Sequence, residues 1–211
     1  FIFLLIILTP LPNCGYSDNT MILIPGGVFK LGINPSDKIL FFLSDQTTNL
    51  NAQPIQEINI PTFYIDKMEV TYGQFKQYKS RLNYSGKMNE PVRNISWYEA
   101  DAYCLWNKKR LPKEFEWEKA SRGQDGRLFV WGNEFDRSFA NFSRKVRPGG
   151  SFHKDKSIYG VWDLNGNVSE WTASTFNPLT DIVVGEINPD YTFAIDALKA
   201  GKHVYCEKPM V

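Results

Sequence analysis

The order of hydrophobic and polar positions predicts strands in the first part of the chain. The run "MILIPGGVFKLGIN", residues 21–34, has an apolar stretch, a Pro-Gly-Gly turn signal and then alternating apolar positions. This pattern predicts a β-hairpin. A further strand is expected around Phe63, Tyr64 and Ile65, because bulky and β-branched side chains favour a pleated, half-buried surface.

Capping signals and helical spacing predict three helices. Thr71 and Gln74 have the spacing of a capping box, and Phe75, Tyr78 and Leu82 follow on one helical face.

A second capping box, Ser96 with Glu99, opens the run "SWYEADAYCLWNKKR". Trp97, Ala100 and Cys104 share its inward face, where Cys104 is expected to be a small core residue.

The third helix is expected in "LPKEFEWEKASRG", with Pro112 in the first turn and Gly123 at the stop. After it, the pattern indicates short strands and Gly/Asn turns, with little helix before residue 193. Helices in the first part of the chain, followed by irregular loops in its later part, are typical of an α+β fold.

Composition excludes some classes of function. The chain has 211 residues, of which 43% are hydrophobic, and a net charge of +1. This balance is typical of a chain with a packed core, and it gives no surface that would follow a phosphate backbone, so we expect no nucleic acid partner. The three cysteines lie far apart without a CxxC pair, so the sequence gives no support for zinc or thioredoxin-type chemistry and no disulfide framework.

Residues 1–20 are expected to be the remnant of a secretory or lipoprotein signal. Residues 1–8 are almost wholly apolar and a polar, turn-forming stretch follows, a pattern typical of export and too short for a membrane span. Cys14 follows a sequence similar to a bacterial lipobox, so we expect a bacterial periplasmic or cell-surface lipoprotein, with membrane contact only through a lipid on Cys14. The alternative is an N-terminal strand.

The stretch "YGVWDLNGNVSEWT", residues 159–172, combines carboxylates with turn residues. One interpretation is a calcium loop, since calcium binds carboxylate and carbonyl oxygens at relaxed geometry. The other is a strand-turn-strand with Asn165 and Gly166 in the turn and Trp162 and Trp171 in the core. The two interpretations of this stretch are compatible with each other.

Several motifs together resemble one family. They are "MILIPGGVFKLG", "FYIDKMEVTYGQF", "PVRNISWYEADAYCLWNKKRLPKEFEWEKASRG", "VWGNEFD", "FANF" and "YGVWDLNGNVSEWT". In this order, over residues 21–174, they resemble the sulfatase-modifying-factor family, which is the formylglycine-generating enzyme (FGE) domain. The resemblance implies a C-type-lectin-like α+β fold with little regular secondary structure.

The resemblance also implies structural calcium in the last of these motifs. Its ligands would be the side chains of Asp163 and Glu170 and the backbone carbonyls of Gly166 and Val168.

A second calcium site of the family is matched only in part. Asn141 and Phe142 match its first ligands, but the acidic stretch that completes it is missing. The alternative is that Asn141 caps a turn.

The copper site of the family is absent from this sequence. Active enzymes of the family that this chain resembles share a pair of cysteines that binds copper(I). The pair lies after an "RGGSW"-like segment and before a "GFR"-like strand. This chain has neither segment, and its "RPGGSFHKD", residues 147–155, precedes the "GNVSEW" loop instead. We therefore expect an FGE-type domain truncated at its C-terminal end and without formylglycine-generating activity.

The last segment, "DIVVGEINPDYTFAIDALKAGKHVYCEKPMV", residues 181–211, resembles a fragment of the Gfo/Idh/MocA oxidoreductases, in which Lys208 would lie at the nicotinamide site. No G-x-G-x-x-G occurs in the chain, so we expect no dinucleotide cofactor. Residues 175–211 are therefore predicted to be an unrelated tail that packs poorly, with a helix over 193–200. A purposeful fusion is the alternative.

Two hypotheses for function follow. The first is an FGE-like protein whose parent acted on a sulfatase-type polypeptide. The second is a non-catalytic surface or lipoprotein module on the same scaffold, of the gliding or secretion type, with cell-envelope proteins as partners.

Overall fold

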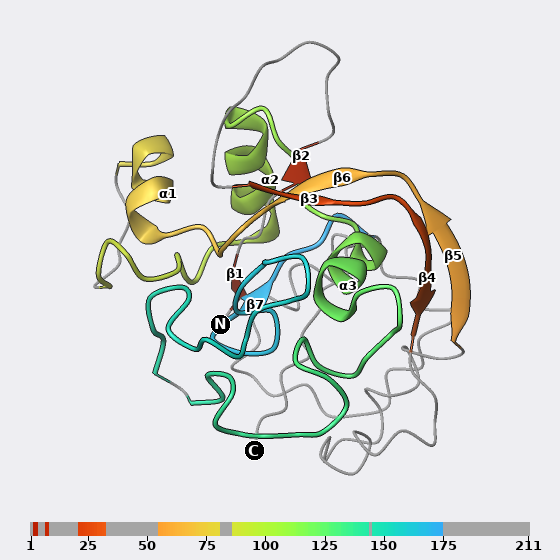
Figure 1. Ribbon diagram of the computed structural model, residues 1–211. Coiled ribbons are helices and arrows are strands. Elements are labelled where there is room, and N and C mark those ends of the chain that lie inside the picture. Colours follow the sequence, from red (N-terminus) through yellow and green to blue (C-terminus); the bar gives the residue numbers. More distant parts are fainter. Residues whose placement is uncertain are drawn as a thin grey trace, which may run out of the picture.

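The computed structural model has three helices and seven short strands among its described residues, which are 21–32, 55–80, 86–143 and 145–174 with the backbone of 2–3 and 7–8 (Figure 1). The strands are β1 Ile2–Phe3, β2 Ile7–Leu8, β3 Met21–Ile24, β4 Gly27–Leu31, β5 Gln56–Ile60, β6 Phe63–Asp66 and β7 Ser169–Glu170. The helices are α1 Tyr72–Tyr78, α2 Trp97–Trp106 and α3 Glu114–Arg122. This mixture of helix and sheet with few regular elements confirms the α+β prediction.

The hairpin predicted over residues 21–34 is wrong. β3 pairs with β6 and β4 pairs with β5, both antiparallel, so the two chain segments form one long bent ribbon (Figure 1). Pro25 and Gly26 mark the bend where the chain passes from one ladder to the other. At Gly26 a Cβ would lie 2.8 Å from the backbone nitrogen of Thr62. The Pro-Gly-Gly signal therefore reflects this close approach and not a chain reversal.

The N-terminal segment contributes backbone to two sheets. β1 pairs parallel with β7, and β2 pairs antiparallel with β6. This pairing matches the alternative of an N-terminal strand, while export and a lipid on Cys14 stay predictions. Within the described residues, no helix has the length and apolar character needed to cross a membrane.

Both predicted capping boxes are present. Thr71 Oγ1 accepts from the backbone N–H of Gln74, and the Gln74 side chain accepts from the Thr71 N–H. Ser96 and Glu99 make the same reciprocal pair at the start of α2. The predicted position of Leu82 lies outside the described residues.

Helix α3 starts two residues after Pro112, at Glu114. Lys113 is its N-cap, so Pro112 precedes the helix and is not in its first turn. The N–H of Lys113 donates to Glu116 Oε2 at 2.7 Å, and this bond fixes the start. Gly123 ends the helix with a φ of 74°, as predicted for a C-terminal glycine.

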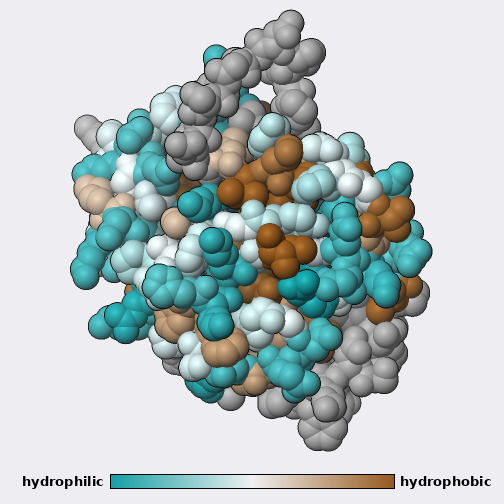
Figure 2. Space-filling model, viewed as in Figure 1, coloured by the Kyte–Doolittle hydropathy of each residue, from teal (hydrophilic) through white to brown (hydrophobic). Residues whose placement is uncertain are grey.

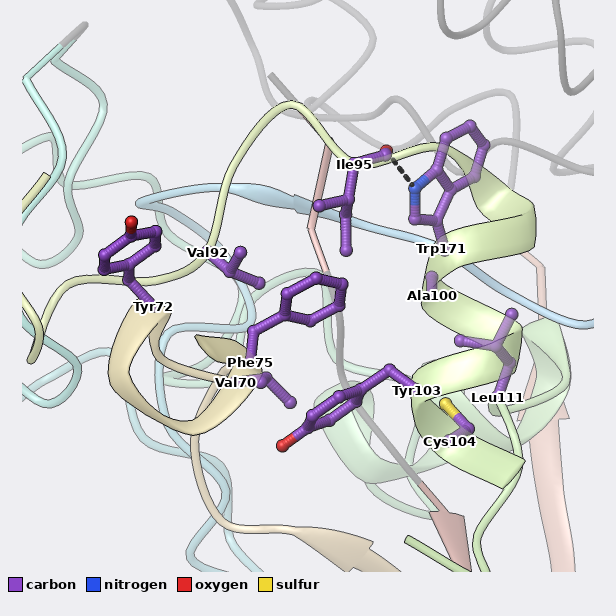
Figure 3. Close-up of a cluster of buried hydrophobic side chains, with 10 residues drawn as sticks. All are labelled: Val70, Tyr72, Phe75, Val92, Ile95, Ala100, Tyr103, Cys104, Leu111 and Trp171. Atoms are coloured by element: carbon purple, nitrogen blue, oxygen red, sulfur yellow. Dashed lines mark hydrogen bonds between the residues drawn. The ribbon is translucent and has the colours of Figure 1, made fainter. Parts of the chain in front are cut away.

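Two separate hydrophobic cores lie under these elements. The first, which we call the helical core, lies between α1 and α2 (Figure 3) and contains Val70, Tyr72, Phe75, Val92, Ile95, Ala100, Tyr103, Cys104, Leu111 and Trp171. The second, the ribbon core, lies between the bent ribbon and α3 and contains Ile24, Phe29, Ile60, Phe63, Ile65, Trp117, Ala120, Val130, Val161 and Leu164. Cys104 is buried in the helical core, which confirms its predicted role as a small core residue.

Candidate functional site

The loop from Asp163 to Glu170 connects the two cores. Leu164, near its start, is buried in the ribbon core, and Trp171, directly after its end, is buried in the helical core. The indole N–H of Trp171 donates to the carbonyl of Ile95 at 3.0 Å (Figure 3). The loop therefore holds the relative position of the two halves of the domain.

Asp163, the first predicted calcium ligand, is buried and has a φ of 58°. Its Oδ2 accepts from the N–H of Gly150 at 2.6 Å, and its own N–H donates to the Asp155 carbonyl. Asp155 is also fully buried, and its Oδ1 accepts from the N–H of Asn165 at 3.0 Å. Two buried aspartates, joined through this backbone hydrogen bond, thus lie at the start of the loop.

The two predicted carbonyl ligands flank a tight turn. The N–H of Val168 donates to the Gly166 carbonyl at 2.9 Å, which closes a γ-turn around Asn167 with a φ of 70°. This positive-φ form of the γ-turn is rare and strained, and such strain persists only where the surroundings impose it. A Cβ on Gly166 would lie 2.6 Å from the backbone nitrogen of Asn141, so only glycine fits there.

The side chain of Asn167 connects three segments. Its Nδ2 donates to the carboxylate of Glu69 at 3.1 and 3.2 Å and to the carbonyl of Arg147 at 3.1 Å. Its Oδ1 accepts from Asn141 Nδ2 at 2.9 Å and from the N–H of Arg147 at 3.0 Å. Glu69 is buried, so a third carboxylate is held against the loop.

Glu170, the last predicted ligand, is buried in β7. The structure therefore places both predicted carboxylates in the interior, at the two ends of one loop. Both predicted carbonyl residues lie on the backbone between them.

Asn141 is held by protein partners. Its Oδ1 accepts from the N–H and the hydroxyl of Ser143, at 3.2 and 2.7 Å, as in a turn-capping asparagine. Its carbonyl accepts from the N–H of Asn167 at 2.8 Å. The structure thus shows the alternative turn cap and brings the two predicted calcium segments side by side; the second site, with Phe142, stays a prediction.

Buried carboxylates gather in the loop and on the segments that contact it. Four carboxylates that belong to the loop or contact it, Glu69, Asp155, Asp163 and Glu170, are each at most 3% exposed. Burial of a carboxylate is costly unless hydrogen bonds or a cation compensate its charge. Within the described part of the chain, no three side chains of His, Cys, Asp or Glu converge as a metal cluster, so a calcium ion here would need backbone carbonyls among its ligands. Each carbonyl has two lone pairs, and that of Gly166 can therefore accept a second partner.

Copper does not fit the described residues. Cys104 is fully buried in the helical core, and burial together with the charges of Asp101 and Asp66 raises the pKa of its thiol far above the ordinary value. Copper(I) needs soft thiolate ligands, and a thiol that stays protonated in an apolar core does not supply one.

Sequence reasoning missed three residues of this site: Glu69, Asp155 and Asn167. A buried acid is not visible in a local pattern, because exposed and buried acids look alike in sequence. The one available signal was the acidic residue directly before Val70 inside a strand-like apolar run.

The chain matches the family described as "Sulfatase-modifying factor enzyme 1-like domain" over residues 9–207. This range includes most of the segment that resembles an oxidoreductase, and the comparisons lend that resemblance no support. Residues 175–211 lie outside the described residues, so the predicted domain boundary stays untested. The poor packing predicted for this tail, including its apolar residues Val183, Ile195 and Leu198, stays untested as well.

Named relatives are similar over parts of their length. The uncharacterized protein YfmG of Bacillus subtilis is 29% identical over 87% of this chain and 48% of its own length. The inactive C-alpha-formylglycine-generating enzyme 2 of Mus musculus is 41% identical over 44% of this chain and 34% of its own length. The chain therefore spans about half or less of the length of these relatives.

A solved structure shares the fold. PvdO from Pseudomonas aeruginosa superposes with a TM-score of 0.60 at 19% identity, covering 74% of this chain and 71% of PvdO. With the family match across most of the chain, the conclusion is direct: this chain belongs to the sulfatase-modifying factor enzyme 1-like (FGE-sulfatase) domain family.

Proposed function

We propose that the loop from Asp163 to Glu170 binds calcium as a structural ion, on a scaffold of the C-type-lectin-like type. The single observation that supports it best is the burial of two carboxylates, Asp163 and Glu170, at the ends of the loop that connects the two cores, with the buried carboxylates of Glu69 and Asp155 on segments that contact it. Two carboxylates and the carbonyls of Gly166 and Val168 supply about four to six of the oxygens that calcium takes, and water completes the shell. The ion would neutralise buried charge and fix a region with few backbone ladders.

Calcium is expected to raise the melting temperature of the chain by about 5 °C at roughly a hundredfold excess over its dissociation constant. Glu170→Gln should abolish this rise, because the amide keeps the shape and removes the charge. The measurement is thermal unfolding followed by circular dichroism, with calcium and with a chelator.

Glu57→Gln is the matched control, because Glu57 is an exposed glutamate on β5. It should keep the full calcium response. Magnesium should give a much smaller rise, since it demands stricter octahedral geometry. A melting temperature that calcium leaves unchanged in the parent chain would show that the loop is only a turn.

We further propose that this polypeptide does not generate formylglycine and serves as a non-catalytic domain of the family. The buried thiol of Cys104 supports this proposal, since burial raises its pKa and a protonated thiol is a poor ligand for copper(I). The mouse relative, named as an inactive formylglycine-generating enzyme, agrees with such a role on this scaffold.

The chain is expected to leave a CxPxR-type peptide unchanged in the presence of copper and a thiol. Mass spectrometry of the peptide gives the result, with an active formylglycine-generating enzyme run in parallel. Loss of sulfur mass from the peptide cysteine, above the level of a Cys14→Ser and Cys206→Ser double variant, would refute the proposal and assign the activity to those two thiols.

A further inference from the structure

The stretch from residue 137 to residue 156 concentrates positive charge. The whole chain has 24 Lys and Arg against 23 Asp and Glu, so its charges nearly cancel. This stretch has Asp155 as its single acid, and that acid is fully buried. Its basic residues are Arg137, Arg144, Lys145, Arg147, Lys154 and Lys156. One short stretch therefore holds an excess of positive charge that the rest of the chain offsets.

Four of these basic residues, Lys145, Arg147, Lys154 and Lys156, are exposed. No ion pair among the described residues includes any of the four. The surface over these loops is mostly hydrophilic, whereas a hydrophobic patch lies over β3 and β6 (Figure 2). Exposed charges without a counter-charge in their own chain attract a partner of the opposite sign.

The backbone of this stretch is fixed although none of the helices or strands lies in it (Figure 1). The N–H of Arg147 donates to Asn167 Oδ1 at 3.0 Å, and its carbonyl accepts from Asn167 Nδ2 at 3.1 Å. The N–H of Gly150 donates to Asp163 Oδ2 at 2.6 Å. The cations therefore project from a frame that a partner does not have to order, which lowers the entropic cost of binding.

Aromatic rings hold two of the lysines in place. Lys156 Nζ lies 4.9 Å from the centroid of the Trp162 ring, and Lys154 Nζ lies 5.6 Å from that of Phe139. His153 packs edge-on against the same Trp162 ring, with the centroids 6.1 Å apart. An ammonium group has three donor hydrogens, so contact with one ring face leaves donors for an acceptor from solvent or from a partner.

We propose that residues 145–156, which we call the basic loop, bind an acidic segment of a partner polypeptide. Gly149 and Gly150 lie between its two groups of cations in the sequence, and without side chains they let an extended chain approach the backbone. Carboxylates spaced along such a chain can then reach cations on both sides of the glycines.

The charges favour a polypeptide over a nucleic acid. The isoelectric point of the chain is 7.8, below the range above about 9 that is typical of domains that bind nucleic acid. Three of the four exposed cations are lysines, which act as point charges, whereas bidentate recognition of phosphate uses the planar fork of arginine.

Fluorescence anisotropy with labelled peptides tests the proposal on the full chain. The probe is a peptide of alternating glutamate and glycine, and the control peptide has glutamine in place of glutamate. The acidic peptide should bind with a dissociation constant of about 100 μM at low salt, and the control peptide at least about tenfold more weakly. Raising the salt from about 20 to about 200 mM should weaken binding of the acidic peptide about tenfold, because salt screens exposed charges.

Two double variants locate the binding surface. Lys154→Glu combined with Lys156→Glu should weaken binding about tenfold, because it places like charges against the peptide. Lys87→Glu combined with Lys108→Glu has the same net charge and should bind as the parent does. Lys87 and Lys108 are also exposed and belong to no ion pair of the described residues. Circular dichroism and melting temperature confirm that both double variants fold.

Three results would overturn the proposal. The first is equal binding of the acidic and the control peptide by the parent chain. The second is an equal loss of affinity in the two double variants, which would mean that net charge and not the basic loop decides binding. The third is tighter binding of a single-stranded DNA of the same charge, or of vesicles of phosphatidylserine and phosphatidylcholine, which would assign the basic loop to another kind of polyanion.

Discussion

Replacing Trp171 with alanine should lower the free energy of unfolding by about 3–5 kcal/mol, the range for deletion of a fully buried aromatic side chain. Trp171 is fully buried in the helical core and follows directly on the loop that connects the two cores. Its loss leaves a cavity and removes the donor to the carbonyl of Ile95, itself buried. Urea unfolding followed by circular dichroism measures the change.

Two further variants separate the causes. Trp171→Phe keeps an aromatic ring in the core but removes the N–H and part of the indole. Its cost should lie below that of Trp171→Ala and include about 1–3 kcal/mol for the unsatisfied buried acceptor. Trp106→Ala, at a half-exposed tryptophan of α2, should cost about 1 kcal/mol in dilute solution. If Trp171→Ala costs no more than Trp106→Ala, the helical core does not depend on the end of the loop.

The three helices were predictable because their signals are local. A capping box involves residues only three positions apart, so Thr71 with Gln74 and Ser96 with Glu99 were visible before any tertiary contact was known. The apolar spacing of α2 likewise identified the buried face of Ala100 and Cys104.

The strand pairing was not predictable in the same way. Pro25-Gly26-Gly27 is a good turn signal, yet the partner of β3 is β6, far along the chain. A strand chooses its partner by burial of its face, and the same residues that permit a chain reversal also permit a bend. The local sequence therefore indicates where the strand is interrupted, but not which strand pairs with it.

The candidate site was predictable only where its residues are consecutive. Asp163, Gly166, Val168 and Glu170 lie in one motif, and the structure buries both carboxylates. Calcium binding by these residues stays a prediction. Glu69 lies 98 residues before its partner Asn167, and nothing in either local sequence indicates the pair.

Replacing Asn167 with alanine is the other change with a large expected effect, about 3–5 kcal/mol of unfolding free energy. The variant removes both hydrogen bonds to the buried carboxylate of Glu69, and a hydrogen bond to a charged group contributes about 1.5–3 kcal/mol. It also leaves Asn141 without its side-chain acceptor and forces alanine to a φ of 70°. Asn167→Gly should recover about 1 kcal/mol of the loss, because glycine adopts that φ without strain.

An exchange of the two side chains distinguishes the hydrogen bond from general packing. Asn167→Asp alone should be worse than Asn167→Ala, since it places a second carboxylate against that of Glu69. Adding Glu69→Gln restores one amide and one carboxylate in reversed positions, so the double variant should regain a large part of the stability. Chemical denaturation of the parent, the two single variants and the double variant gives the coupling energy between the positions. A coupling energy near zero would mean that Asn167 stabilises the loop only through its backbone, and that the Glu69 carboxylate is held by other contacts.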